Sequence, residues 1–259
     1  MRCLAEQAKI LLAEAEDNNL GVDKLQAAMD RWHTCSLCEQ DYHGVVLCAL
    51  GWACWKTYLG RPETDPTRIG AMRLLAGGLC GAKHYTDALS VYEAEFSMLR
   101  RLGDSESNLL AVQSNLASLY QFLGRSEEAL SVRQEVYSVN LKLNGKQHGL
   151  TLIAANNYAH CLLTLRKCEE AKSLLRKTVP VARRVQREGD ENTLRLRWNY
   201  ARALREDDGA TLDDLRKAVT TLEETAPIAR RVLGISHPLA LSIENYLQEA
   251  QAALRSRTE

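Results

Sequence analysis

The chain has 259 residues, and its 33 Lys and Arg residues balance its 33 Asp and Glu residues, so its formal net charge is zero. No net field draws it onto nucleic acid or an anionic membrane, and neither is expected as a partner. Two Phe, five Pro and many strong helix formers disfavour a β-rich class and predict an all-α fold.

The first part of the chain, 1–67, fits no repeat and is expected to form a helical N-terminal cap region. Its sequence pattern predicts helices at about 2–16, 22–34 and 41–59. The first is acidic and amphipathic, whereas a signal peptide would be basic and then apolar. The apolar run in the third, 45–55, is about half of the roughly 20 residues that cross a bilayer. The expectation is a soluble, cytoplasmic protein.

The apolar residues of 41–59 form a broad stripe, which predicts a helix that is buried nearly all round. Surplus apolar surface there would allow a homodimer through the N-terminal region. The eight cysteines lie mostly beside Leu and Ala in helix-patterned stretches. This setting is typical of thiols in a reducing compartment, so no disulfide framework is expected.

Cys35 and Cys38, with His33 and His43 nearby, have the spacing of zinc ligands. The pattern lacks a second pair of ligands at similar spacing. The favoured interpretation is therefore that the two thiols pack on a helix face, with no cofactor. A zinc site and a redox pair remain as alternatives.

From residue 68 onward the chain repeats itself. An alanine that follows a charged residue recurs at separations of 41, 42 and 47 residues, at Ala88, Ala129, Ala171 and Ala218. A second marker recurs at separations of 42, 42 and 47, at Leu102-Gly103, Asn144-Gly145, Gln186-Arg187 and Leu233-Gly234. Both markers lengthen in the same interval, so an insertion of about five residues is expected near 205–211. A capping box from Thr211 to Asp214 would open the next helix.

Each period has the pattern of two helices. In 108–149 the first helix carries apolar residues at i, i+4 and i+7, and Gly124 ends it. The second is expected from about Glu127 to Leu143, with Ala129 where the two helices cross most closely. The repeats are predicted at about 68–107, 108–149, 150–191 and 192–255, the last with a C-terminal capping helix at 238–255.

These residues resemble the tetratricopeptide repeats of the long, kinesin-light-chain type, whose units run "N-N-L-A … Y … G-x-x-E-E-A … L-G-x-x-H-P". The best matches are Asn115-Leu116-Ala117, Asn156-Asn157-Tyr158-Ala159, Glu169-Glu170-Ala171, Asn199-Tyr200-Ala201 and Leu233-Gly234-Ile235-Ser236-His237-Pro238. The resemblance implies a right-handed superhelix of about four long hairpins behind the cap, and the binding of peptides or other proteins. Whether a motor complex is involved stays open.

In such a superhelix the first helices line the inner wall, so residues that recur in one register form a row there. One row, at intervals of 42 residues, is Asn115, Asn157 and Asn199. An Asn amide both donates and accepts, which suits the backbone of an extended peptide. The residues one turn further on are Ser118, His160 and Arg202. Alternatively, each Asn bonds a neighbouring helix and has a structural role.

The sequence contains no Gly-rich phosphate loop, nucleophile elbow or H-E-x-x-H motif, and no enzyme is expected. The favoured function is a non-catalytic scaffold that binds a protein or an extended peptide in the groove of the superhelix. The alternative is a zinc-stabilised or redox-sensing regulatory protein centred on Cys35 and Cys38. Metal content separates these two hypotheses.

Overall fold

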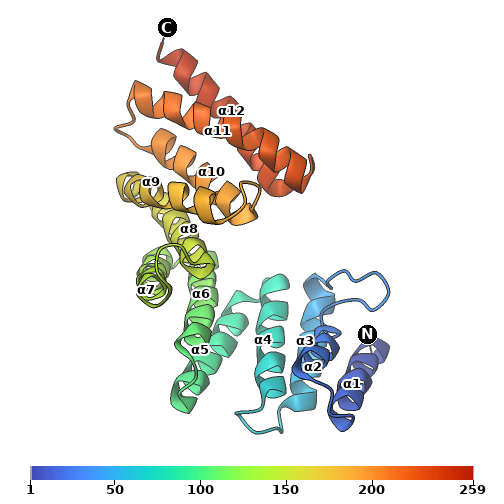
Figure 1. Cartoon of the computed structure of the whole chain (residues 1–259). Coiled ribbons are helices and arrows are strands. Elements are labelled where there is room, and N and C mark those ends of the chain that lie inside the picture. The colour runs from blue at the N-terminus through green and yellow to red at the C-terminus, as the bar shows by residue number, and fades with distance from the viewer. Residues whose placement is uncertain (1, 259) are drawn as a thin grey trace. The chain divides into compact units, whose positions relative to one another are not determined.

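The computed structural model describes residues 2–258 and confirms the all-α fold class (Figure 1). Within these residues, the β pairing is limited to a single bridge between Thr34 and Asp41. No helix in this part of the chain is both long and apolar enough to span a bilayer. The chain divides into two compact units, an N-terminal unit at Met1–Arg125 and a C-terminal unit at Ser126–Glu259.

The N-terminal unit contains the predicted cap region and the first repeat. Its helices are α1 (Arg2–Asp17), α2 (Val22–Asp30), α3 (Gly44–Tyr58), α4 (Pro66–Gly81), α5 (Tyr85–Leu102) and α6 (Glu106–Phe122). Helix α3 packs on α4, α4 on α5 and α5 on α6, and α1 packs on α2 and α3. One core cluster lies among α4, α5 and α6, and a second, around Trp32 and Tyr58, joins the first three helices to α4.

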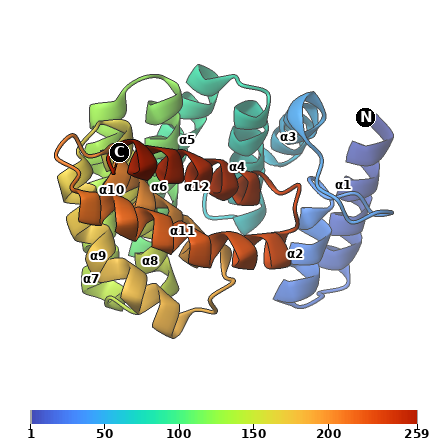
Figure 2. The same ribbon diagram turned by 90° about the horizontal axis from the view of Figure 1, so that it is seen from above.

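In the C-terminal unit, first and second helices of the repeats alternate along the chain. They are α7 (Ser126–Asn144), α8 (Gly149–Thr164), α9 (Cys168–Val185), α10 (Glu191–Glu206), α11 (Leu212–Leu233) and α12 (Pro238–Ser256). Each packs on the next, and the first helices of successive repeats also meet, α8 with α10 and α10 with α12. In both views α11 and α12 lie side by side (Figure 2).

The alanines that mark the repeat are packing positions. The four of them, each with no exposed surface, are Ala88, Ala129, Ala171 and Ala218. A larger side chain at these points would separate helices that are in contact, which is the physical reason for the marker. The handedness of the predicted superhelix and the repeat boundaries stay predictions.

The predicted insertion lies in a loop between two helices, because α10 ends at Glu206 and α11 begins at Leu212. The predicted capping box is also present. The Asp214 backbone N–H donates to Thr211 Oγ1 at 3.1 Å, and Asp214 Oδ2 accepts from the Thr211 backbone N–H at 3.2 Å. Two N–H groups that the first turn of a helix leaves unpaired are thus satisfied.

Replacing Thr211 with alanine removes one half of this box. The free energy of unfolding is expected to fall by about 1 kcal/mol, measured by urea denaturation. Thr220 is a matched control, since it is exposed within α11 and bonds only the carbonyl of Arg216 one turn back. Thr220→Ala is expected to leave stability unchanged or slightly raised, since alanine is the better helix former. Equal losses in both variants would contradict the assignment.

The predicted burial of 41–59 on nearly all sides is wrong. Val45 is 74% exposed and Trp52 is 43% exposed. The reason is that α4, α1 and the residues in and just after α2 cover part of α3 and leave one side of the helix exposed. The apolar stripe was too broad to indicate which of its residues would lack a partner.

The packing of α3 on α4 depends on two glycines. A Cβ atom added to Gly51 would lie 2.9 Å from the Cα of Leu75, and one added to Gly78 would lie 2.8 Å from the Cα of Cys48. The two backbones are therefore in direct contact. Asp65 is the N-cap residue of α4, and its side chain accepts from the backbone N–H of Thr67 at 2.7 Å. The cap determines where α4 begins, and the close contact determines which side of α4 faces α3.

Candidate functional site

The first helices of the C-terminal unit present a continuous set of interacting side chains, which we call the α8–α10–α12 face. It comprises Asn156, Asn157 and His160 of α8, Trp198, Asn199, Arg202 and Glu206 of α10, and Tyr246 of α12. Four of the six residues predicted for peptide binding lie here. The helices carry these side chains at the same register because α8 packs on α10 and α10 packs on α12.

Arg202 lies at the centre of this face. Its Nε donates to Glu206 Oε1 at 3.1 Å, and its Nη1 lies 3.5 Å from Nδ1 of His160. Its guanidinium carbon is 5.3 Å from the centre of the Trp198 ring. These contacts come from two helices and restrict a long side chain to few rotamers, so the cation is held in place before any partner arrives.

Glu206 and Tyr246 extend the face to α12. The Tyr246 hydroxyl donates to Glu206 Oε1, and the Tyr246 and Trp198 rings meet edge to face with centres 6.4 Å apart. Burial, followed by the bond to Glu206, raises the pKa of Tyr246. Glu206 therefore accepts from both Arg202 and Tyr246 and connects α10 to α12.

His160 is the most accessible of the predicted polar residues in this unit. Desolvation of the imidazole by the atoms packed around it lowers its pKa, and the nearby cations Arg202, Arg133 and Arg195 lower it further. The ring is therefore neutral at neutral pH and offers one donor and one acceptor. Asn157 is half-buried beside it.

Asn199 has a different environment from the one expected for a peptide contact. Only 2% of its surface is exposed, and its Nδ2 donates to Asn156 Oδ1 at 2.9 Å. The bond joins α10 to α8. This environment fits the alternative interpretation, in which the Asn side chain bonds a neighbouring helix and has a structural role. Asn199 does not pair with Asn157, the residue at its own register in the preceding repeat.

Asn115 and Ser118 belong to the N-terminal unit. Asn115 is exposed on α6, and the Ser118 hydroxyl donates to the carbonyl of Ser114 at 3.2 Å. Whether these two residues share one face with the other four stays a prediction.

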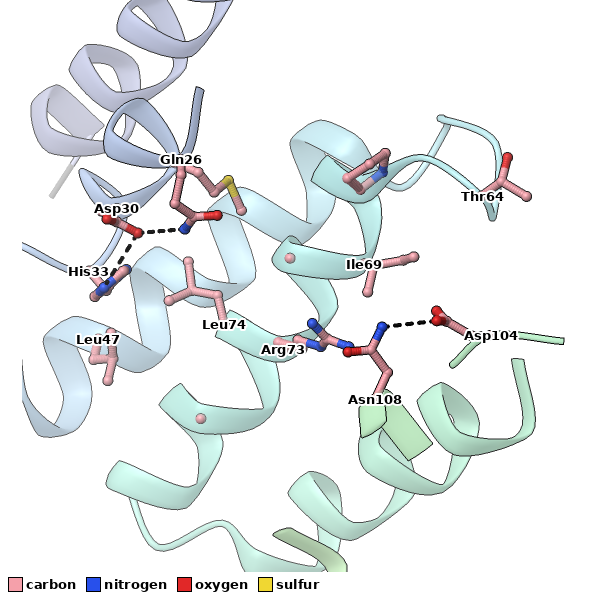
Figure 3. Close-up of a pocket in the computed structure, with 14 residues that line it drawn as sticks. Gln26, Asp30, His33, Leu47, Thr64, Ile69, Arg73, Leu74, Asp104 and Asn108 are labelled. Carbon is pink, nitrogen blue, oxygen red and sulfur yellow. Dashed lines mark hydrogen bonds and ion pairs between the residues drawn. The ribbon is translucent and has the colours of Figure 1, made fainter. Parts of the chain in front are cut away.

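The N-terminal unit contains a groove of about 690 Å³ that the sequence did not indicate (Figure 3). Helix α4 forms its base with Ile69, Gly70, Arg73, Leu74 and Gly77. Residues from α2 and the turn after it lie on one side, and the start of α6 lies on the other. The groove therefore runs across the first helices of this unit.

Polar side chains stand at both ends of this groove. At one end, Asp30 accepts from Gln26 at 2.8 Å and lies 4.0 Å from His33. At the other, Asp104 Oδ1 accepts from the Asn108 amide at 2.9 Å. Between them is Arg73, whose Nε donates to Glu95 Oε1 at 2.6 Å.

The interpretation that Cys35 and Cys38 pack on a helix face is wrong. Helix α2 ends at Asp30, and both cysteines lie in the loop before α3, where Cys38 is exposed. The residues around Cys35 form a turn in which the backbone N–H of Cys38 and then that of Leu37 lower the pKa of Cys35 to about 7. Within this loop Thr34 and Asp41 pair through a β-bridge, and the Thr34 hydroxyl donates to Asp41 Oδ1 at 2.9 Å.

The two histidines do not complete a metal site with this pair. His33 faces Asp30 in the groove. Within residues 2–258 there is no group of three or more His, Cys, Asp or Glu side chains arranged to hold a metal ion. The zinc alternative therefore gains no support.

Several residues of these surfaces were missed at the sequence level. In the C-terminal unit they are Asn156, Trp198, Glu206 and Tyr246, and in the N-terminal unit they are Asp30, Arg73, Asp104 and Asn108. Two glycines of α4 were a usable signal, because Gly70 and Gly78 lie where other groups approach the helix closely.

Comparisons with known proteins agree with the repeat pattern. Residues 108–184 match the family model of the tetratricopeptide repeat. No curated protein sequence matches the chain significantly. The similarity to solved structures extends beyond residues 108–184 and covers most of the chain.

Three solved structures illustrate this similarity. A Podosopora anserina protein described as a kinesin light chain with nearly identical TPR-like repeats has 19% identity and a TM-score of 0.57, over 90% of this chain and 95% of that one. BtubC (BKLC) from P. vanneervenii has 18% identity and a TM-score of 0.53, over 82% and 91%. RapI in its apo form has 15% identity and a TM-score of 0.66, over 97% and 67%. Residues 108–184 therefore match the tetratricopeptide repeat, and the fold of most of the chain is similar to that of kinesin-light-chain-like repeat proteins.

Proposed function

We propose that this protein is a non-catalytic scaffold and that its α8–α10–α12 face binds a protein or an extended peptide. The observation that carries the proposal is the central position of Arg202, held by contacts from two helices beside the accessible His160. A side chain that is already ordered loses little entropy when a partner binds it. Asn157 adds an amide that can pair with a peptide backbone.

The repeat family supports this class of function, since the tetratricopeptide repeat is generally a protein-interaction fold. A Rap protein of similar fold, with a TM-score of 0.55, has been crystallised in complex with Competence and Sporulation Factor. That likeness concerns the fold alone, so the partner of this chain is a separate question. The fold is nevertheless compatible with holding another molecule.

The side chains of the α8–α10–α12 face are suited to hydrogen bonds with the backbone of a bound peptide. His160 is neutral, Asn157 can donate and accept, and Arg202 already shares its charge with Glu206. A partner would therefore gain hydrogen bonds from this face rather than a strong, unshielded ion pair. Asn199 acts in this proposal as a positioning residue, because its bond to Asn156 fixes α10 against α8.

Selection of random peptides of about 12 residues on the full chain tests the proposal, with dissociation constants measured by fluorescence anisotropy. Asn157→Ala combined with His160→Ala is expected to weaken at least one class of selected peptides by about tenfold. A matched control is Gln134→Ala with Lys177→Ala, which truncates two exposed residues of the second helices α7 and α9. If every selected peptide binds the first variant as it binds the wild type, the face is not the binding site. If no peptide is selected, the scaffold proposal is wrong.

We also propose a cytoplasmic location and a homodimer. A cytoplasmic location suits the eight cysteines, which are all free. A homodimer through the N-terminal region would use the uncovered side of α3, where Val45 and Trp52 are exposed. Sedimentation of the full chain at several concentrations measures that association.

A further inference from the structure

The groove of the N-terminal unit, defined above, carries more negative than positive charge. Asp30 and Asp104 stand at its two ends. Among residues 2–258 neither forms an ion pair with a Lys or Arg side chain, and the Asp30 contact with His33 is 4.0 Å long. Hydrogen bonds from Asn108 and the Ser105 backbone, and after them the charge of Arg73, lower the pKa of Asp104, so this carboxyl stays ionised.

The one cation of the groove is already compensated. Arg73 donates from Nε to Glu95, and the Glu95 side chain has no exposed surface. Because a buried carboxylate needs a partner to remain charged, Glu95 holds the guanidinium and offsets its charge. The two aspartates therefore leave the groove with an excess of negative charge.

Apolar surface separates the two acidic ends. Leu74 and Ile69 of α4 and Met29 of α2 line this stretch. Gly77 leaves the base open, since a Cβ atom added there would meet no atom within 4 Å. A side chain from outside therefore has room to enter between the aspartates.

We propose that this groove binds a segment of a partner protein in which Lys or Arg side chains flank an apolar side chain. The apolar side chain would rest on α4 between Leu74 and Gly77, and the two cations would pair with Asp30 and Asp104. Both aspartates repel an acidic or phosphorylated segment, which therefore does not compete. The inference rests on the proposed scaffold function, but it concerns a different surface and names the chemistry of the partner.

The test uses the peptides selected on the full chain and two kinds of variant. Gly77→Leu fills the base of the groove, and Gly77→Ala is its control, because the methyl group alone lies in open space. Asp30→Asn with Asp104→Asn removes the two charges and keeps both side chains as hydrogen-bond acceptors. Asp17→Asn with Glu93→Gln is the matched control, because it removes two exposed charges of the same unit outside the groove.

The inference predicts a class of selected peptides with Lys or Arg on both sides of an apolar residue. Gly77→Leu and the Asp30/Asp104 variant should each weaken this class by at least about tenfold, and the controls should leave its affinity unchanged. Raising the salt concentration should weaken binding to the wild type. Urea denaturation of each variant shows whether it is folded.

Each contrary outcome has its own meaning. If the selected peptides are acidic or neutral, or if basic peptides bind Gly77→Leu with unchanged affinity, the groove does not bind this segment. The scaffold proposal survives that result when other peptides lose affinity for the Asn157/His160 variant. If no peptide of any class is selected, the scaffold proposal and this inference are both wrong.

Discussion

Gly78→Ala is expected to lower the free energy of unfolding of the N-terminal unit by about 3 kcal/mol. The added methyl group would lie 2.8 Å from the Cα of Cys48 and 2.9 Å from the carbonyl oxygen of Leu47. Both are backbone atoms of α3, which cannot move without displacing the whole helix. The loss should therefore exceed the gain of about 0.5–1 kcal/mol that alanine brings to a helix in place of glycine.

The adjacent residue provides the control for this prediction. Gly77 is in the same helix, but a methyl group added to it would contact nothing within 4 Å. Gly77→Ala should therefore raise the free energy of unfolding by about 0.5–1 kcal/mol. Urea denaturation followed by tryptophan fluorescence suits the comparison, because Trp32, Trp52 and Trp55 are three of the four tryptophans and all lie in this unit. If both variants shift the midpoint in the same direction, α3 and α4 do not touch at Gly78.

Arg73→Met is expected to lower the free energy of unfolding by about 3 kcal/mol at pH 8, because it leaves the buried Glu95 without its cation. Glu95 Oε2 has no hydrogen-bond partner among the described residues, so nothing else stabilises the charge. Burial raises the pKa of Glu95 in the folded protein, and Arg73 opposes that shift. Loss of Arg73 raises this pKa further.

The loss of stability in Arg73→Met is expected to increase with pH. A carboxyl with a raised pKa binds its proton more readily when the protein is folded, so stability is highest below the pKa of the unfolded chain and falls as the pH rises through the folded pKa. Arg73→Met should therefore be less harmful at about pH 5 than at about pH 8. Adding Glu95→Gln to this variant should restore most of the stability at the higher pH and remove the extra slope. A loss that is equal at both pH values would contradict the role of Glu95.

The local features of the chain could be predicted from the sequence. The capping box at Thr211, the loop in 205–211 and the buried alanines of the repeat all follow from residues that lie close together along the chain. The cap region was predicted less well, because its three helices follow no repeat. The second helix is an example, because it ends at Asp30 and not at about 34 as predicted, and Thr34 instead pairs with Asp41.

The candidate binding surfaces were predicted only in part. The sequence placed His160 and Arg202 one turn beyond the Asn row, and the structure brings them within 3.5 Å of each other. The sequence could not show that Asn199 pairs with Asn156. The spacing of the repeat alone does not tell which of the adjacent residues Asn156 and Asn157 faces the next helix. The groove on α4 was missed because its residues come from four helices, α2, α3, α4 and α6, and from the loops between helices.

The sequence by itself determined that the chain is helical, that from residue 68 onward it repeats with a period of about 42 residues, and where a few of its helices begin or end. These properties depend on helix propensity, caps and apolar spacing, which act over a few residues. The tertiary structure decided which side of α3 stays uncovered, which polar side chains are buried, and where a groove remains. Those outcomes depend on how far two helices can approach each other, and that distance is set by side chains far apart in the sequence, such as Gly51 and Gly78 with the backbones that they meet.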